Sequence, residues 1–436
     1  MLTELGGGII GSTTAYFLSH HPSFRKESDT ITLLEAREIA GGASGKAGGL
    51  LALWAYPSCI VPLSYKLHQE LAEKHGGADR WGYRAVHCGQ IDMYGVLAQT
   101  RKGGAKGEEA GEEEEEEEEE EPSGQSRDSS SVSLQKRTQK AIGLLRAAGV
   151  PSDLDWIAAE GIKSYEEMGT PLTTAQVHPY LFTTSMAQLA EEQGVKIVYG
   201  SATNIVVEDK TVKSVSYKPR GSDDSDSDSD EQSLPADTVI LTAGPWTRSI
   251  WSPAPISALR AHSVTIRPSR PVSAYALFTS IDMPRAHNNN NNNNNSNKRG
   301  ETVTPEIYAR PNNEVYACGE GDHLTPLPTS TNLVECDDSR CQDIIDQVSA
   351  ISEELRNGTV TARQACYLPN VSRGGGGGGP LIGQTSVNGL LMGAGHTCWG
   401  IQNGPATGKL LSEFVFEGGA KSAVKIEGLD PRRFGV

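Results

Sequence analysis

A glycine-rich segment close to the N-terminus limits this chain to a small set of folds. Gly6, Gly8 and Gly11 fit the pattern G-x-G-x-x-G, and small and apolar residues typical of a helix start follow them. In a dinucleotide-binding βαβ unit, the first glycine permits a tight turn and the second lets a pyrophosphate approach the backbone. The third lets helix and strand pack closely. The segment therefore predicts a nucleotide-binding turn, with Ile9 and Ile10 at the N-terminus of a helix that faces the phosphates.

An acidic residue at the expected spacing supports this prediction. Residues 30–35 form an apolar stretch typical of a strand, and it ends in Glu35, 24 residues after Gly11. A carboxylate there can accept hydrogen bonds from both ribose hydroxyls. The segment before the glycines, residues 1–5, is short and carries Thr3 and Glu4. Because buried parallel strands are usually near-continuous apolar runs, we expect a weak first strand.

Three further segments favour a flavin over a nicotinamide cofactor. Residues 43–52 (ASGKAGGLLA) combine small residues, which let backbone N–H groups approach a pyrophosphate or a ring edge, with the Ser44 hydroxyl and the Lys46 cation. Residues 238–246 predict a buried strand that ends in Ala-Gly. Residues 389–404 predict a strand that enters a glycine turn, and residues 405–415 predict a helix with Pro405 in its first turn.

Together these motifs resemble the D-amino-acid oxidase, glycine oxidase and sarcosine oxidase (DAO) superfamily of FAD-dependent oxidoreductases, in particular a fungal branch with the ASGKAGGLLA motif. The resemblance implies an α/β fold, with a Rossmann-like, glutathione-reductase-like FAD-binding domain and an α+β substrate domain that contains a large mixed or antiparallel sheet. We expect residues 1–55, 160–262 and 360–436 in the FAD-binding domain, and 56–159 and 263–359 in the substrate domain. Low-complexity composition predicts loop inserts at 106–134, 220–233, 286–300 and 374–379.

The same resemblance implies a set of FAD contacts spread along the chain. A helix followed by residues 194–200 matches the family, which places a turn against the adenine where Ala202 and Thr203 fall. The expected cofactor-binding residues are Gly6, Gly8, Ile9, Ile10, Gly11, Glu35, Ala36, Ser44, Gly45, Lys46, Ala47, Gly48, Gly49, Leu50, Ala202, Thr203, Ala243, Gly244, Trp246, Gly395, His396, Trp399, Gly400 and Ile401.

In this family a substrate amine loses a hydride from carbon to flavin N5, and the resulting imine hydrolyses. The resemblance places the turn 395–401 across the flavin, where the following helix dipole would stabilise negative charge by about 0.3–2 kcal/mol. His262, His396 and Trp399 are the candidate catalytic residues. Each has an alternative interpretation as a packed structural side chain. The electron acceptor, oxygen or another molecule, stays open.

Two positions near residue 366 depart from the family pattern. Cys366 falls where sarcosine-oxidase-like relatives attach FAD covalently, but the Tyr-Leu-Pro that follows is offset, so we expect non-covalent FAD and keep the covalent link as an alternative. Relatives that oxidise amino acids place an arginine just before the proline, to hold the substrate carboxylate. This chain has Leu368 there, which leaves Lys46, Arg260 and Arg267 as candidate cations.

Charge and composition exclude several other classes of protein. The net charge of −16 is concentrated in two inserts, and without their 18 acidic residues it becomes +2, which argues against a nucleic-acid-binding face. No apolar run approaches the roughly 20 residues of a membrane-spanning helix. The seven cysteines contain no Cys-x-x-Cys pair, so we expect no metal site and a reducing compartment.

We therefore expect a monomeric cytoplasmic enzyme without a leader peptide, acting on a small-molecule substrate; peripheral endomembrane association stays open. The alternative is an FAD-binding protein with a regulatory or trafficking role and weak or no catalysis, in which the acidic inserts contact protein partners. Two local predictions complete the picture. Residues 306–311 and 314–319 should form a hairpin across Asn312-Asn313, and residues 339–355 should form one amphipathic helix.

Overall fold

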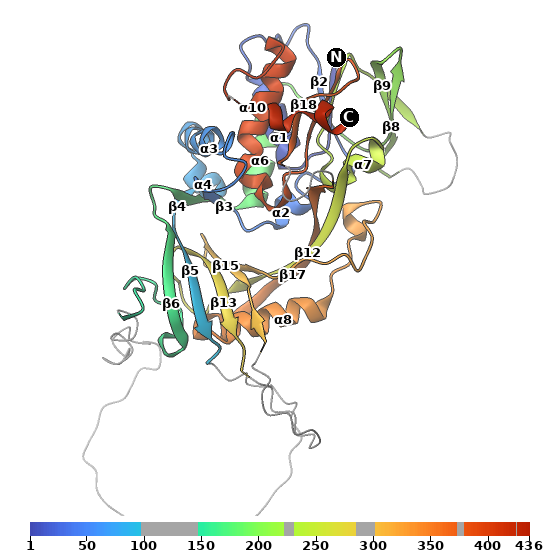
Figure 1. Cartoon of the computed structure of the whole chain (residues 1–436). Coiled ribbons are helices and arrows are strands. Elements are labelled where there is room, and N and C mark those ends of the chain that lie inside the picture. Colours follow the sequence, from blue (N-terminus) through green and yellow to red (C-terminus); the bar gives the residue numbers. More distant parts are fainter. Residues whose placement is uncertain (97–146, 222–230, 285–300, 373–378, 424) are drawn as a thin grey trace, which may run out of the picture.

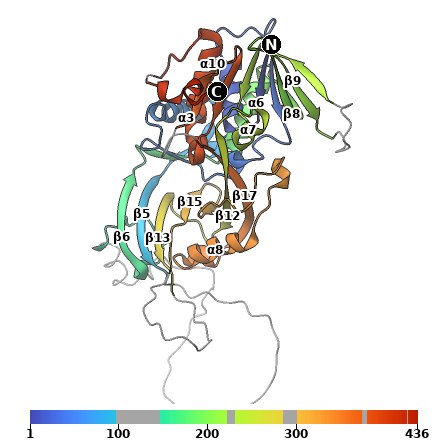
Figure 2. The ribbon, with the colours of Figure 1, turned by 45° about the vertical axis from the view of Figure 1, so that its right-hand side comes forward.

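The computed structural model describes residues 1–96, 147–221, 231–284, 301–372, 379–423 and 425–436. They form two layered bodies, each built on a large sheet, with a small third sheet between them (Figures 1 and 2). The predicted inserts 106–134 and 286–300, and most of 220–233 and 374–379, lie outside these residues.

The first sheet has eight strands in the order β10-β9-β8-β2-β1-β11-β19-β18. Its bounds are β1 Leu2–Leu5, β2 Ile31–Glu35, β8 Lys196–Glu208, β9 Thr211–Pro219, β10 Gln232–Pro235, β11 Thr238–Leu241, β18 Leu381–Gln384 and β19 Leu390–Ala394. Helices α1 (Ile9–Ser19), α6 (Pro179–Glu192) and α10 (Gly400–Glu417) pack together, and their apolar side chains share a core with Leu33 and Ile240 of the sheet. The five parallel strands with these helices form the expected Rossmann-like domain.

The second sheet has the strand order β17-β12-β16-β15-β13-β5-β6, with β14 paired to β13. Its bounds are β5 His87–Tyr94, β6 Ile162–Gly169, β12 Ile256–Arg267, β13 Tyr275–Asp282, β14 Thr302–Val303, β15 Glu306–Arg310, β16 Glu314–Cys318 and β17 Thr359–Val371. Only the β5–β13 pair is parallel, so the sheet is mixed, as expected. Helix α8 (Asp338–Ser349) covers the face turned away from the first domain (Figure 1).

The connection between the bodies contains the small sheet β3-β7-β4, formed by Leu50–Ala52, Thr174–Gln176 and Arg84–Ala85. The short helix α2 (Ala43–Lys46) precedes β3. Helices α3 (Val61–His75) and α4 (Gly77–Trp81) follow it, and α3 packs on α10 of the first domain. No helix in the described stretches is long and apolar enough to cross a bilayer.

Sheet membership corrects the predicted domain boundaries. Strand β6, expected in the FAD-binding domain, instead pairs antiparallel with β5 and forms the edge of the second sheet. Strands β12 and β17 pair along their whole length in the second sheet, so residues 256–262 and 360–371 also belong there. Helix α3, expected in the substrate domain, instead packs in the core of the first domain.

Three local predictions also need correction, and one is confirmed. Ser352 caps a new helix, α9 (Glu353–Arg356), by accepting a hydrogen bond from Leu355, so the predicted helix 339–355 breaks in two. Strand β8 continues through the turn predicted at 202–203, with only a register shift there. Helix α10 begins five residues before Pro405. The hairpin across Asn312-Asn313 is present, with a three-residue loop (Pro311 to Asn313) between the paired Arg310 and Glu314, and both asparagines have positive φ (64° and 55°), a conformation that asparagine tolerates.

Candidate functional site

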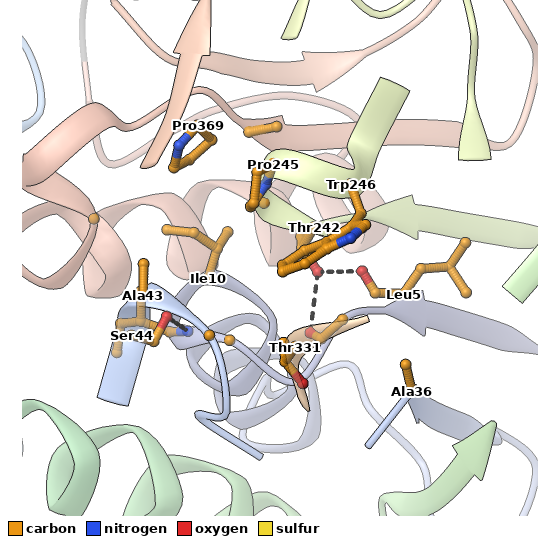
Figure 3. Close-up of a pocket in the computed structure, with 18 of the residues that line it drawn as sticks. Leu5, Ile10, Ala36, Ala43, Ser44, Thr242, Pro245, Trp246, Thr331 and Pro369 are labelled. Atoms are coloured by element: carbon orange, nitrogen blue, oxygen red, sulfur yellow. Dashed lines mark hydrogen bonds between the residues drawn. The ribbon is translucent and has the colours of Figure 1, made fainter. Parts of the chain in front are cut away.

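A long cavity runs along the carboxyl ends of β1, β2, β11 and β19, where ligands bind in open α/β sheets (Figure 3). Its empty volume is about 1470 Å³ including the open mouth. Its lining extends from Glu35 at the end of β2 to Cys398 in the turn after β19, so the cavity suits an extended ligand. Leu5, Thr242 and Trp246 line one part of it, and Ala43 and Ser44 line another.

The three glycines after β1 have the geometry that their motif predicts. Gly6 has φ +113°, a conformation open mainly to glycine, and a side chain there would meet Thr242 O at 2.7 Å. Gly8 lines the cavity, and a Cβ on it would meet only Ser44 Oγ, at 3.1 Å. A Cβ on Gly11 would lie 1.8 Å from Gly6 O. Gly11 therefore lets α1 approach the turn, and the absence of a side chain at Gly8 leaves the backbone there open to the cavity.

Two long helices present their N-termini to this cavity. Gly8, Ile9 and Ile10 of the α1 start line it, as do Gly400 and Ile401 of the α10 start. Neither N-cap residue makes a side-chain cap, and neither first turn contains an acidic residue. Ser44 Oγ accepts the Ile9 N–H at 2.9 Å, which fixes α2 against α1. The remaining amides and both helix dipoles favour negative charge in the cavity, as a pyrophosphate or a flavin ring edge would bring.

Glu35 lies at the end of β2 and lines the same cavity. Its two carboxylate oxygens accept the Gly7 and Arg37 backbone N–H groups at 2.7 and 2.9 Å. Burial raises the pKa of Glu35, while these hydrogen bonds lower it. Each oxygen retains a lone pair, so the carboxylate is fixed in place and can still accept a ribose hydroxyl.

The other end of the cavity is formed by the turn between β19 and α10. Gly395, with φ +85°, reverses the chain, and His396, Thr397 and Cys398 follow it along the cavity wall. His396 Nε2 hydrogen-bonds Thr407 Oγ1 at 2.9 Å. Burial lowers the pKa of His396 to about 3, so the imidazole is uncharged at neutral pH.

Sixteen of the predicted cofactor-binding residues line the cavity. They are Gly6, Gly8, Ile9, Ile10, Glu35, Ala36, Ser44, Ala47, Ala202, Ala243, Gly244, Trp246, Gly395, His396, Gly400 and Ile401. Eight others are not among its lining residues: Gly11, Gly45, Lys46, Gly48, Gly49, Leu50, Thr203 and Trp399.

Contacts with the rest of the protein account for four of these eight residues. A side chain on Gly45 would meet Ala40 O at 2.3 Å, and one on Gly48 would enter the Tyr308 ring at 2.0 Å. Thr203 instead donates to Glu231, and Trp399 packs edge-on against Trp54.

The predicted catalytic and charged residues of β12 and β17 lie elsewhere. His262 is buried on the α8 side of the second sheet, where its Nε2 accepts the Asp337 N–H at 3.1 Å, so it cannot act in the cavity. Arg260 is paired with Asp322 at 3.2 Å, and Arg267 lies at the exposed end of β12. Leu368 lines the cavity, but Cys366 does not.

The sequence motifs missed one wall of the cavity. Thr329, Ser330 and Thr331 line it from a loop of the second domain. Ser330 Oγ accepts a hydrogen bond from Arg37 Nε at 3.1 Å, which ties this loop to the end of β2. Trp246 Nε1 also donates to the carbonyl of Pro328 in the same loop. No local pattern marks a Pro/Ser/Thr loop as a ligand wall, since only tertiary contacts bring it there.

The cavity fits FAD in chemistry as well as in length. It offers an open glycine cradle, two uncapped helix N-termini for anionic groups and a fixed carboxylate for a ribose. Its lining is mainly apolar and small, so planar rings can lie against the backbone.

The family model for FAD dependent oxidoreductases (DAO) matches residues 5–414. TDA3 of Saccharomyces cerevisiae, named as an oxidoreductase, is 36% identical, over 99% of this chain and 94% of TDA3. A Schizosaccharomyces pombe protein also named as an oxidoreductase, C1F5.03c, is 32% identical, over 98% of this chain and 96% of its own length.

Among solved structures, the fold is similar to glycine oxidase from Geobacillus kaustophilus (TM-score 0.64, 15% identity, 98% of this chain and 97% of that one). It is also similar to L-proline dehydrogenase from P. horikoshii (TM-score 0.63, 16% identity, 100% and 97%). The match of the family model over nearly the whole chain and the identity to TDA3 carry the assignment, and the cavity provides the site that the cofactor requires. The chain therefore belongs to the DAO family of FAD-dependent oxidoreductases.

Proposed function

We propose that this enzyme oxidises a C–N bond of a small amine or an (N-methyl) amino acid, with hydride passing from the substrate carbon to flavin N5. The observation that carries the proposal is the position of the turn after β19. Cys398 of this turn lines the FAD cavity, and it also lies close enough to Glu306 of the second sheet for their charges to interact. The end of the cavity is therefore next to the face of the sheet that this family uses for substrates. Both solved structures named above are enzymes that act on amino acids.

Bound FAD supplies the hydride acceptor, and the residues of this chain position and tune it. The α10 N-terminus at Gly400 and Ile401 stabilises negative charge, which favours a reduced ring. His396, uncharged because burial lowers its pKa to about 3, acts as a hydrogen-bonding wall and not as a proton acceptor at neutral pH. The amine nitrogen must therefore lose its proton to another group before its carbon gives up a hydride.

The surroundings of Cys366 support non-covalent binding of FAD. Burial raises the pKa of this thiol to about 11, and the nearby Lys46 ammonium lowers it only in part. At neutral pH the group is a thiol and not a thiolate, which makes it a poor nucleophile toward a flavin ring.

The test is an anaerobic titration of the purified, FAD-containing protein with a panel of primary amines, secondary amines, amino acids and N-methyl amino acids. Bleaching of the visible flavin absorbance by one of these classes is expected. Air is then admitted. Rapid return of the flavin colour identifies an oxidase, whereas slow return in air together with fast electron transfer to an added dye identifies a dehydrogenase. Bound flavin that no amine or amino acid reduces would refute the proposal.

A further inference from the structure

A row of side chains crosses the second sheet on the face opposite α8. The strand register places Ser263 opposite Cys318, Cys318 opposite Glu306, and Glu306 opposite Phe278. Directly paired residues share one face of a sheet, so these four side chains point the same way. Tyr308, two residues after Glu306, lies on this face and directly under Gly48 of the first domain. The row therefore faces the FAD-binding domain.

Glu306 is a partly buried carboxylate in this row. Its Oε2 accepts the Tyr308 hydroxyl, and the Cys318 thiol lies 4.0 Å away. Within the residues that the structure describes, it makes no ion pair with lysine, arginine or histidine. Burying a carboxylate without a cation is unfavourable, so the surroundings of Glu306 favour a positively charged ligand.

A series of neighbouring aromatic rings extends from Glu306 to the end of the cavity formed by the turn between β19 and α10. The Phe278 ring lies 6.2 Å from the Tyr308 ring and 5.9 Å from that of Trp54. Trp54 in turn lies 5.5 Å from Trp399, which directly follows the cavity-lining Cys398. Trp54 is 38% exposed, so its ring is not enclosed in a core and is free to contact a ligand. Ring faces attract alkylammonium groups through cation–π interactions.

The cations near this face are engaged in protein contacts. Arg310 donates to the carbonyls of Ala47 and Gly48 and pairs with Glu314 at 2.8 Å. Lys46 Nζ donates to the Ala365 carbonyl at 3.0 Å. Leu368 stands in place of the arginine before Pro369, and Arg310 and Lys46 are both held by protein groups, so neither is free to hold a substrate carboxylate in the bidentate manner.

We infer that the substrate end of this site selects a small alkylammonium compound that needs no carboxylate group. Glu306 pairs with the cationic nitrogen, and the rings of Phe278, Trp54 and Trp399 surround its alkyl groups. This inference deepens the proposed function and rests on it for the identity of the substrate as an amine. It excludes simple amino acids as the preferred substrates.

The test uses three probes of one shape: tetramethylammonium, tert-butanol and trimethylacetate. Tetramethylammonium has no nitrogen lone pair and cannot be oxidised through its nitrogen, so its binding is measured apart from catalysis. Each probe is titrated into the oxidised, FAD-containing protein and followed by the flavin difference spectrum and by calorimetry. The cation should bind at least about tenfold more tightly than the neutral and anionic probes.

Variants assign that preference to a residue. Glu306→Gln should weaken tetramethylammonium binding by about tenfold or more. Glu320→Gln, which removes a charge from an exposed position two residues after Cys318, should leave it unchanged. The inference is wrong if trimethylacetate binds as tightly as tetramethylammonium and Lys46→Met abolishes the binding of trimethylacetate. It is also wrong if Glu306→Gln leaves the affinity for tetramethylammonium unchanged. The comparison of three probes on the unmodified protein needs no variant to fold.

The pH dependence gives a further check. Burial raises the pKa of Glu306, and the titratable groups that face it, Tyr308, Cys88, Cys318 and Cys398, also have pKa values raised by burial and stay neutral. Since tetramethylammonium does not titrate, its affinity should increase as pH rises and Glu306 ionises. Affinity independent of pH between about 5 and 8 would contradict the ion pair. Selective binding without reduction by any amine would refute only the proposed function.

Discussion

Replacing Glu4 with leucine should stabilise the folded protein, and the gain should grow with pH. Glu4 lies in the middle of β1, between Leu33 of β2 and Ile240 of β11, and its side chain is completely buried. Oε1 receives only a long hydrogen bond from Thr242 Oγ1 (3.4 Å), and Oε2 has no partner among the described residues. Thr242 Oγ1 also bonds Leu5 O at 2.9 Å, so it keeps a partner when Glu4 is removed.

The sign of the pH effect follows from the direction of the pKa shift. Burial raises the pKa of Glu4 well above its ordinary value, and the nearby Thr242 and Thr14 hydroxyls lower it only in part. The folded protein therefore holds the Glu4 proton more tightly than the unfolded chain does. Stability falls as pH rises from the unfolded pKa of about 4.3 toward the raised folded value, and stays low above it. Leucine removes this loss.

We expect a gain in unfolding free energy of about 1–3 kcal/mol at pH 8, the usual cost of an unsatisfied buried polar group, and a smaller gain at about pH 5. Glu4→Gln is the matched control, because it removes the charge but keeps a buried polar group, so its gain should be pH-dependent but smaller. The assay is urea unfolding at both pH values with free FAD held constant, since bound cofactor adds to apparent stability. Equal gains at the two pH values, or a less stable Glu4→Leu protein at pH 8, would refute the reasoning.

Three further predictions concern the cofactor. Gly11→Ala should abolish FAD retention in the purified protein, because the added Cβ would lie 1.8 Å from Gly6 O. Gly419→Ala is the control: a Cβ there would have no heavy atom within 4 Å, so this variant should retain a full flavin-to-protein ratio. Cys366→Ser should keep its flavin, and acid precipitation should release the colour from both proteins into the supernatant; colour in the wild-type pellet would establish a covalent link. Deleting residues 108–121, which lie outside the described residues, should leave FAD content unchanged, and loss of flavin would place them within the fold.

Most of the residues that the motifs predict for the cofactor line the cavity, because backbone requirements select particular residues there. Gly6 has a positive φ, and Gly11 sits against a carbonyl where no side chain fits, so the spacing of these glycines carries direct geometric information. The position of Glu35 at the end of β2 follows from the same unit, since the strand after α1 must end at the cavity. Pro405 shows a limit of such rules. It lies inside α10, and the Ile401 carbonyl, which cannot bond a proline nitrogen, bonds His68 Nε2 at 2.9 Å instead.

The domain boundaries could not be predicted, because single strands serve both bodies. Strand β17 runs for 13 residues, from Thr359 at its exposed start to the cavity wall at Leu368 and Pro369. Strand β12 pairs with it throughout, so no single residue separates the domains. Apolar periodicity reports only which face of a strand is buried, and not which sheet the strand joins. His262 is not among the residues that line the cavity, because its side chain lies on the α8 face of β12, beside Asp337.

The second half of the ASGKAGGLLA motif was assigned to the cofactor, but its contacts are with the other domain. The carbonyls of Ala47 and Gly48 accept hydrogen bonds from Arg310, and the Tyr308 ring fills the space that a Gly48 side chain would need. Leu50 belongs to the same apolar cluster as Tyr308. Small residues are therefore required here by the approach of the second sheet, while Ser44 and Ala47 meet the cavity. Because Ala47 both lines the FAD cavity and bonds Arg310, the motif sets the position of the substrate face relative to the cofactor.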